Sequence, residues 1–97
     1  MAALDPKTGQ PSTGPIEEQV RITLENLRTL LREAGGSLTN VVRTTVFLAD
    51  MNDFQAMNDV YATFFPHNPP ARTTIQAARL PMDFLVEIDA IAWIDED

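Results

Sequence analysis

Two short runs of alternating residues near the end of the chain restrict its fold most strongly. In the segment 86–92, apolar side chains alternate with the carboxylates Glu87 and Asp89, a pattern typical of a half-buried β-strand. Before it, two consecutive prolines favour extended backbone and lead into a second predicted strand that begins near Arg72. These strands form a sheet with one apolar face, which other elements must cover.

The side chain of Arg72 is the first candidate for chemistry. Strand alternation places Arg72 on the same face as Thr74 and Gln76. We expect the carboxylates of Glu87 and Asp89 to share this face. A guanidinium on a strand, rather than on a flexible loop, suits a fixed fork that binds a carboxylate through two parallel hydrogen bonds. The alternative is a surface arginine on a solvated sheet face, because most charged side chains in such places are only solvated.

Two other stretches show the periodicity of amphipathic helices. The first begins near Pro15 and ends before a Gly-Gly pair, and the second runs from about Asn52 to Phe65. Proline suits the first position of a helix, and glycine allows the left-handed backbone that ends one. Asn52 is expected to cap the second helix. We interpret the apolar stripes of both helices as core.

The order of elements predicts the fold class. With a further strand over 41–48, the order is helix, strand, helix, strand, strand. Two amphipathic helices need one sheet face to bury against, which predicts an α+β two-layer sandwich with both helices on one face of a mainly antiparallel sheet. The opposite face would carry four large apolar side chains, those of Val41, Phe47, Ile91 and Trp93. Such a face is too apolar to stay in water and predicts contact with another subunit.

Composition narrows the function classes. A chain of 97 residues predicts a single domain, 1–97. Its formal net charge of −7 disfavours binding to nucleic acid, which requires a basic surface. His67 is the single histidine, cysteine is absent, and no calcium-loop spacing or glycine-rich phosphate loop occurs, so neither a metal site nor a cofactor is expected. No leader or long apolar run is visible, and we expect a cytoplasmic protein without membrane contact.

Several stretches resemble, in order, the RidA family (also called YjgF/YER057c), the enamine/imine deaminases. The segment 69–81 reads PPARTTIQAARLP, and the segment 86–92 reads VEIDAIA. Earlier in the chain, VRTTVFLADMNDF at 42–54 and NDVY at 58–61 match the same family. The similarity extends from about Leu4 to Ile94. Each motif alone is weak, but their combination in this order is specific.

The resemblance implies a fold, an assembly and a reaction. The fold is chorismate-mutase-like, and the assembly is a homotrimer with clefts between neighbouring subunits that would cover Trp93. The reaction is that of a 2-iminobutanoate/2-iminopropanoate deaminase, which hydrolyses reactive imines or enamines such as 2-aminoacrylate to 2-keto acids and ammonia. By resemblance, Arg72 binds the substrate carboxylate and Glu87 orients or activates water. Thr74, where the family has cysteine, and Asn58 line the cleft.

One departure from the family leaves a second function open. Its members usually carry, before the segment that opens this chain, two strands with a G-P-Y/F-S-Q motif and an S-G-Q motif. The cleft tyrosine and glycine of those motifs have no counterpart here, so an N-terminally truncated sheet with an unpaired edge is expected. The alternative is therefore a trimer that binds small 2-keto acids or other carboxylic acids without turning them over. The RNA cleavage attributed to some members is disfavoured by the acidic charge.

Overall fold

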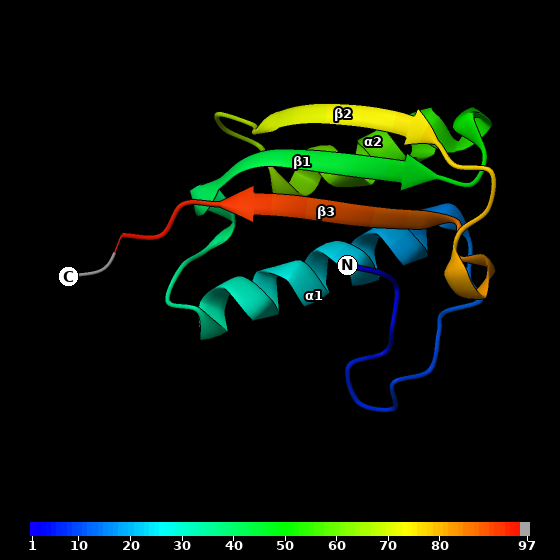
Figure 1. Cartoon of the computed structure of the whole chain (residues 1–97), viewed down its shortest axis with the longest axis horizontal. Coiled ribbons are helices and arrows are strands. Elements are labelled where there is room, and N and C mark those ends of the chain that lie inside the picture. Colours follow the sequence, from blue (N-terminus) through cyan, green and yellow to red (C-terminus); the bar gives the residue numbers. More distant parts are fainter. Residues whose placement is uncertain (96–97) are drawn as a thin grey trace.

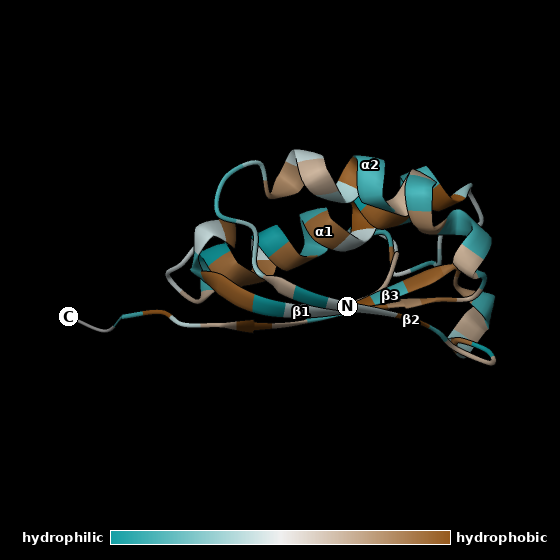
Figure 2. Cartoon of the chain, turned by 90° about the horizontal axis from the view of Figure 1, so that it is seen from above, coloured by the Kyte–Doolittle hydropathy of each residue, from teal (hydrophilic) through white to brown (hydrophobic). Residues whose placement is uncertain are grey.

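The computed structural model describes residues 1–95. Its helices and strands follow one another in the order α1 (Ile16–Glu33), β1 (Val41–Leu48), α2 (Phe54–Phe64), β2 (Ala71–Gln76) and β3 (Val86–Ala92). The three strands form one layer and the two helices form a second layer on one side of it (Figures 1 and 2). The predicted two-layer α+β arrangement is confirmed. Within the described part of the chain, no helix is long and apolar enough to span a bilayer.

The three strands form one sheet in the order β2-β1-β3. Strand β1 pairs in parallel with β2 and antiparallel with β3, so the sheet is mixed rather than mainly antiparallel. The parallel pair arises because α2 connects β1 to β2 and returns the chain to the end of the sheet from which β1 started. Figure 1 shows α2 behind β1 and β2.

Strand register decides which side chains face the helices. Val46 lies opposite Thr74 of β2 and Ile88 of β3, and it is fully buried. A shift in register at the start of β1 marks a β-bulge, where an extra residue interrupts the alternation. The bulge leaves Val42 52% exposed and turns Val41 inward, where it is 6% exposed. The predicted outer position of Val41 is therefore wrong.

The core lies between the inner face of the sheet and the two helices. Helix α1 supplies the largest share. Five residues of the apolar stripe predicted for it are buried, Ile16, Val20, Leu24, Leu27 and Leu31, whereas the sixth, Ala34, follows the end of the helix and is exposed. Met57 and Tyr61 are the buried residues of α2. Figure 2 shows apolar stretches on both helices and along the sheet. Burial of these side chains is the main favourable contribution to folding.

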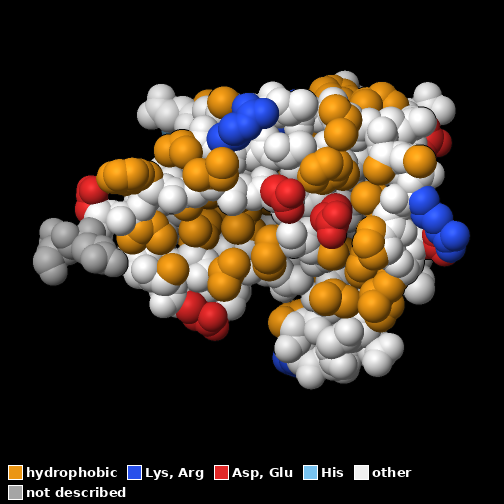
Figure 3. All heavy atoms as spheres, in the orientation of Figure 1, with side chains coloured by type: hydrophobic (Ala, Val, Ile, Leu, Met, Phe, Trp, Pro, Cys, Tyr) orange, Lys and Arg blue, Asp and Glu red, His pale blue; other side chains and the backbone are white. Residues whose placement is uncertain are grey.

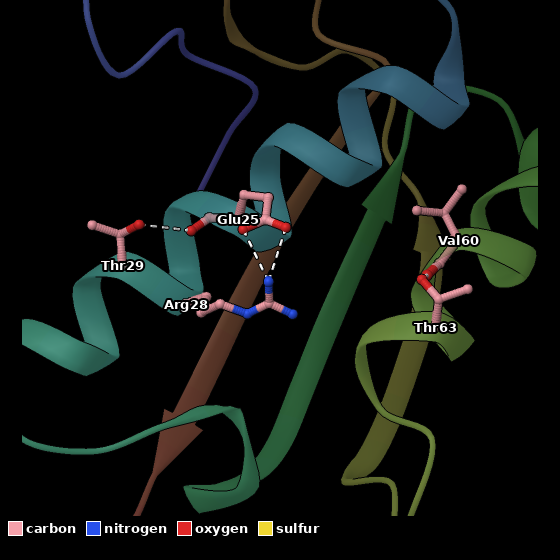
Figure 4. A network of polar contacts seen from close by, with 5 residues as sticks. All are labelled: Glu25, Arg28, Thr29, Val60 and Thr63. Atoms are coloured by element: carbon pink, nitrogen blue, oxygen red, sulfur yellow. Dashed lines mark hydrogen bonds and ion pairs between the residues drawn. The ribbon is translucent and has the colours of Figure 1, made fainter.

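The two helices also meet at an arginine near the edge of the core (Figure 4). Arg28 Nη1 donates to both carboxylate oxygens of Glu25, at 2.9 and 3.1 Å. The guanidinium lies over the ring of Phe64 in α2, 4.9 Å from its centroid. A cation above an aromatic face is attracted to it, so Arg28 links α1 to α2 while a carboxylate balances its charge.

A buried amide joins three parts of the chain. Gln19 is 3% exposed. Its Nε2 donates to the carbonyl of Gly14 at 3.0 Å, and its Oε1 accepts from the backbone N–H of Leu85 at 2.9 Å. An unpaired buried amide is costly, whereas this one uses both of its ends. It therefore fastens the N-terminal loop and the start of β3 to α1.

The start of α2 differs from the prediction. Asn52 is not its cap. Instead, the carboxylate of Asp50 accepts from the backbone N–H of Asn52 at 2.9 Å and caps a single 3₁₀ turn, after which α2 begins at Phe54. Asp53 precedes α2 and makes no capping hydrogen bond with its side chain. Burial raises the pKa of Asp53, and the charges of Asp50 and Glu17 raise it further.

We predict that Asp53→Asn stabilises the protein at neutral pH. Because the folded-state pKa of Asp53 lies above the unfolded value, its contribution to stability is present below the unfolded pKa and is lost as the pH rises through the folded pKa. The amide removes the charge, and the expected gain at pH 7 is about 0.5 kcal/mol. The gain should shrink towards pH 3, where the native carboxyl is protonated.

Urea unfolding at both pH values measures this difference. Asp59→Asn is the matched control, because Asp59 is an exposed carboxylate of α2 that accepts a hydrogen bond from Gln55 at 2.8 Å. Its replacement should bring no gain. A loss of stability in Asp53→Asn at pH 7 would show that the carboxylate favours α2 more than its neighbours disfavour it.

Candidate functional site

Arg72 lies on the inner face of the sheet. In the strand register, it is opposite Thr44, which is 1% exposed and faces the helices. Glu87, in contrast, lies opposite Phe47 on the outer face. The expectation that Arg72 shares a face with Glu87 and Asp89 is therefore wrong. It fails because β2 is an edge strand with polar residues on both faces, so its own pattern does not distinguish inner from outer.

Helix α2 surrounds the guanidinium of Arg72 with neutral groups. Arg72 Nη1 donates to Oδ1 of Asn58 at 2.7 Å. Its Cζ lies 4.7 Å from the ring centroid of Tyr61 and 5.4 Å from that of Phe54. The three α2 residues are spaced four and three apart, which places them on one face of the helix. The structure thus brings together Arg72 and Asn58, two of the predicted site residues.

A cavity of about 400 Å³ opens beside this guanidinium. Besides Arg72 and Asn58, its walls include four largely apolar side chains, those of Tyr61, Phe65, Pro69 and Pro70. An apolar recess with a few polar groups at one point is the usual form of a small-molecule site. Its chemistry fits a small acid whose carboxylate contacts the guanidinium and whose carbon atoms contact the rings.

Tyr61 has a part in this site that its sequence pattern did not reveal. It is 4% exposed, and its hydroxyl lies 2.7 Å from Oγ1 of Thr44. Burial raises the pKa of Tyr61, while the Thr44 hydrogen bond and the charge of Arg72 oppose the rise. The phenol therefore keeps its proton at neutral pH. The helical stripe predicted Tyr61 as core, which is confirmed. Tyr61 also contacts Arg72 through its ring. The one sequence signal for this contact is that Tyr61 lies three residues after Asn58, on the same face of the helix.

Thr74 and Glu87 stand in different surroundings. Thr74 lies on the face of Arg72, opposite the buried Val46, and is partly buried. Glu87 is partly buried on the outer face. Figure 3 shows that face, where acidic side chains over β3 lie among apolar ones. Within one chain, the structure therefore separates Glu87 from the other three predicted site residues.

The outer face of the sheet is mixed, and it carries large apolar side chains that the rest of the described chain does not cover. Its most exposed large side chains are Trp93 at 73% and Ile91 at 62%, and Ile75 is 42% exposed. The indole of Trp93 donates to a carboxylate oxygen of Asp95 at 3.0 Å. Among residues 1–95, no three His, Asp or Glu side chains lie close enough together to hold a metal ion.

Comparison with known proteins gives concordant results at the levels of family, sequence and structure. The model of the family described as Endoribonuclease L-PSP matches residues 1–94. A RutC family protein of Pyrococcus horikoshii is 50% identical over 90 residues, which are 93% of this chain and 71% of that protein. A rat protein named 2-iminobutanoate/2-iminopropanoate deaminase is 47% identical over 89 residues, which are 92% of this chain and 65% of the rat protein.

A solved structure has the same fold. The crystal structure of Escherichia coli TdcF with bound serine matches with a TM-score of 0.90 and 37% identity, covering 97% of this chain and 76% of that one. The sequence and structural matches extend over nearly all of the chain described here. The chain therefore belongs to the Endoribonuclease L-PSP family, also known as the RidA or YjgF family.

Proposed function

We propose that the chain hydrolyses small 2-imino acids and their enamine tautomers, such as 2-aminoacrylate, to 2-keto acids and ammonia, without a cofactor and in the cytoplasm. The observation that carries this proposal is the guanidinium of Arg72, which faces a largely apolar cavity and has Asn58 as its neighbour. The name of the rat relative, 2-iminobutanoate/2-iminopropanoate deaminase, supports the substrate class.

In this proposal Arg72 binds the substrate carboxylate. Because Nη1 contacts Asn58, the other N–H groups of the guanidinium are left for the two carboxylate oxygens. Protonation of the imine nitrogen makes its carbon electrophilic. The oxygen of a water molecule then bonds to that carbon as the C=N π electrons move to nitrogen. One proton of this water passes to the nitrogen, and the C–N bond breaks as C=O forms and the second O–H proton is released, so that the nitrogen leaves as ammonia. Thr74, which is two residues from Arg72 on the same face of β2 but is not among the residues that line the cavity, would contact the substrate from the side, and Glu87 would orient the water or take its proton.

The separation of Arg72 from Glu87 supports a site built by two chains. Since the two side chains lie on opposite faces of one sheet, a single cleft would take Arg72 from one subunit and Glu87 from its neighbour. We propose a homotrimer with three such clefts. The exposed apolar outer face, with Ile91 and Trp93, supports burial between subunits because patches of this kind on soluble proteins usually mark interfaces.

A second candidate is binding of small 2-keto acids without turnover. It is favoured by the observation that Arg72 and Asn58 are in place within one chain, whereas Glu87 is on the other face. A carboxylate site of this kind needs no group that activates water. RNA is a poor ligand for a chain with fourteen acidic residues and seven basic ones.

We predict that Arg72→Lys lowers kcat/KM for freshly generated 2-iminopropanoate by about 30-fold, because an ammonium cannot make two parallel hydrogen bonds to a carboxylate. Initial rates of ammonia release measure the loss. Arg32→Lys is the matched control, since Arg32 is exposed at the end of α1 and should tolerate the same change. Equal rates for wild type and Arg72→Lys would remove Arg72 from the substrate site.

Glu87→Gln separates catalysis from binding. The amide keeps the shape of the side chain but cannot accept a proton, so ammonia release should fall by about 100-fold. Stabilisation by 2-oxobutanoate in a thermal-shift assay should persist, because Arg72 is intact. A wild-type protein that is stabilised by 2-oxobutanoate but releases no ammonia from the imine would support the binding function and contradict the enzymatic one.

Assembly is predicted to depend on the outer face of the sheet. Sedimentation at micromolar concentration should give a trimer, and Trp93 should fluoresce as a buried indole. Ile91→Lys should shift the population towards monomer, because it places a charge in a desolvated contact. Leu30→Lys is the control, since Leu30 is 51% exposed on α1, which belongs to the helical layer and not to the outer face of the sheet. A stable monomer with a water-exposed Trp93 would refute the trimer and the shared cleft.

A further inference from the structure

The guanidinium of Arg72 differs from those of two other arginines in the groups that surround it. Arg28 and Arg79 pair with the carboxylates of Glu25 and Asp83. Among residues 1–95, no carboxylate forms an ion pair with Arg72. Its neighbours are an amide oxygen and two aromatic rings, none of which carries a charge. Arg72 is therefore oriented without being neutralised.

The ring beneath Arg72 is itself fixed from two directions. The hydroxyl of Tyr61 lies 2.7 Å from Oγ1 of Thr44, on the central strand, and both residues are buried. The ring centroid of Tyr61 lies 4.8 Å from that of Phe65. A hydrogen bond at one end and an aromatic contact at the side leave the ring little freedom to turn. The position of the ring is thus tied to β1.

We propose that Tyr61 is a positioning residue that acts on substrate through Arg72. The proposal rests on the function proposed above. An arginine side chain has many rotamers, and fixing one of them on ligand binding is unfavourable. The aromatic face of Tyr61 restricts the guanidinium before the ligand arrives, and the Thr44 bond restricts Tyr61. The ring face is the part that acts on Arg72, and the hydroxyl only holds the ring.

This division of roles predicts different effects for two substitutions. Tyr61→Phe removes the Thr44 hydrogen bond but keeps the ring, which stays buried against Phe65, so the Kd of 2-oxobutanoate should rise by no more than about threefold. Tyr61→Leu removes the ring and should raise both this Kd and the KM for the imine about tenfold, with a much smaller change in kcat. Phe64→Leu is the control, because it removes an aromatic ring of α2 that faces Arg28 and not Arg72.

A double-mutant cycle separates positioning from loss of packing. If Tyr61 acts mainly through Arg72, then Tyr61→Leu should weaken 2-oxobutanoate binding much less once Arg72 is alanine, leaving only the loss of the direct contact between ring and ligand. An equal loss in both backgrounds would overturn the proposal. Phe54→Leu provides a second variant in case Tyr61→Leu does not fold, because Phe54 also lies near the guanidinium but is less buried. It should raise the Kd less than tenfold but measurably, and no change would overturn a role for the α2 rings.

A measurement without ligand distinguishes failure of this proposal from failure of the proposed function. The heteronuclear ¹⁵N–¹H NOE of Arg72 Nε reports its motion on the picosecond to nanosecond scale. The wild-type and Tyr61→Phe proteins should give values close to those of the backbone, and Tyr61→Leu should give a clearly lower value. A mobile Arg72 in the wild type, or an equally rigid one in Tyr61→Leu, would contradict positioning whether or not the protein deaminates imines.

Discussion

The register of strand β1 is the constraint on which the other positions depend. Side chains alternate along a strand, so a slip of one residue would exchange its two faces. Strand β1 is paired on both edges, and its register therefore sets the faces of β2 and β3 as well. With Val46 in the core, Arg72 faces the helices and Glu87 faces away. The packing of an apolar side chain thus decides where the charged ones lie.

The electrostatics of the site follow from this placement. The chain carries a formal net charge of −7, which disfavours the approach of anions in general. Against that background, no carboxylate of the described residues offsets the charge of Arg72, because its neighbours are neutral rings and an amide. Among the described residues, Arg72 forms no ion pair, unlike Arg28 and Arg79. A small carboxylic acid in the cavity would supply the missing counter-charge without the desolvation of a second protein group.

The sequence predicted the helices and strands correctly wherever the periodicity of apolar residues matches their burial in the structure. The stripe of α1 and the alternation in 86–92 identify their elements because one face of each is apolar. The same reasoning fails in two places. At Val41 and Val42, two β-branched residues follow one another, and nothing in the pattern marks the bulge. In β2, polar residues occur on both faces, so alternation shows that Arg72 and Thr74 share a face but not that this face meets α2.

The candidate site was predictable only in part, because the contacts within it depend on how separate elements pack against one another. Family resemblance identified Arg72, Asn58, Thr74 and Glu87 by their positions along the chain. The contact of Arg72 with Tyr61 depends instead on how closely α2 packs on an edge strand, which no local pattern records. The stripe containing Tyr61 correctly indicated burial. A buried tyrosine also has a hydroxyl and a ring face, and here the hydroxyl pairs with Thr44 and the ring face contacts Arg72.

Gln19 has a consequence for reading variation among related chains. Its amide donates a hydrogen bond to one backbone group and accepts one from another. A glutamate could do only the second, a lysine only the first, and an asparagine is one carbon too short to span the same two groups. Glutamine is therefore the side chain that fits this position, for reasons of backbone hydrogen bonding alone. In this fold, hydrogen bonds to backbone groups can by themselves require a particular polar side chain, so such a requirement is not in itself a sign of a catalytic role.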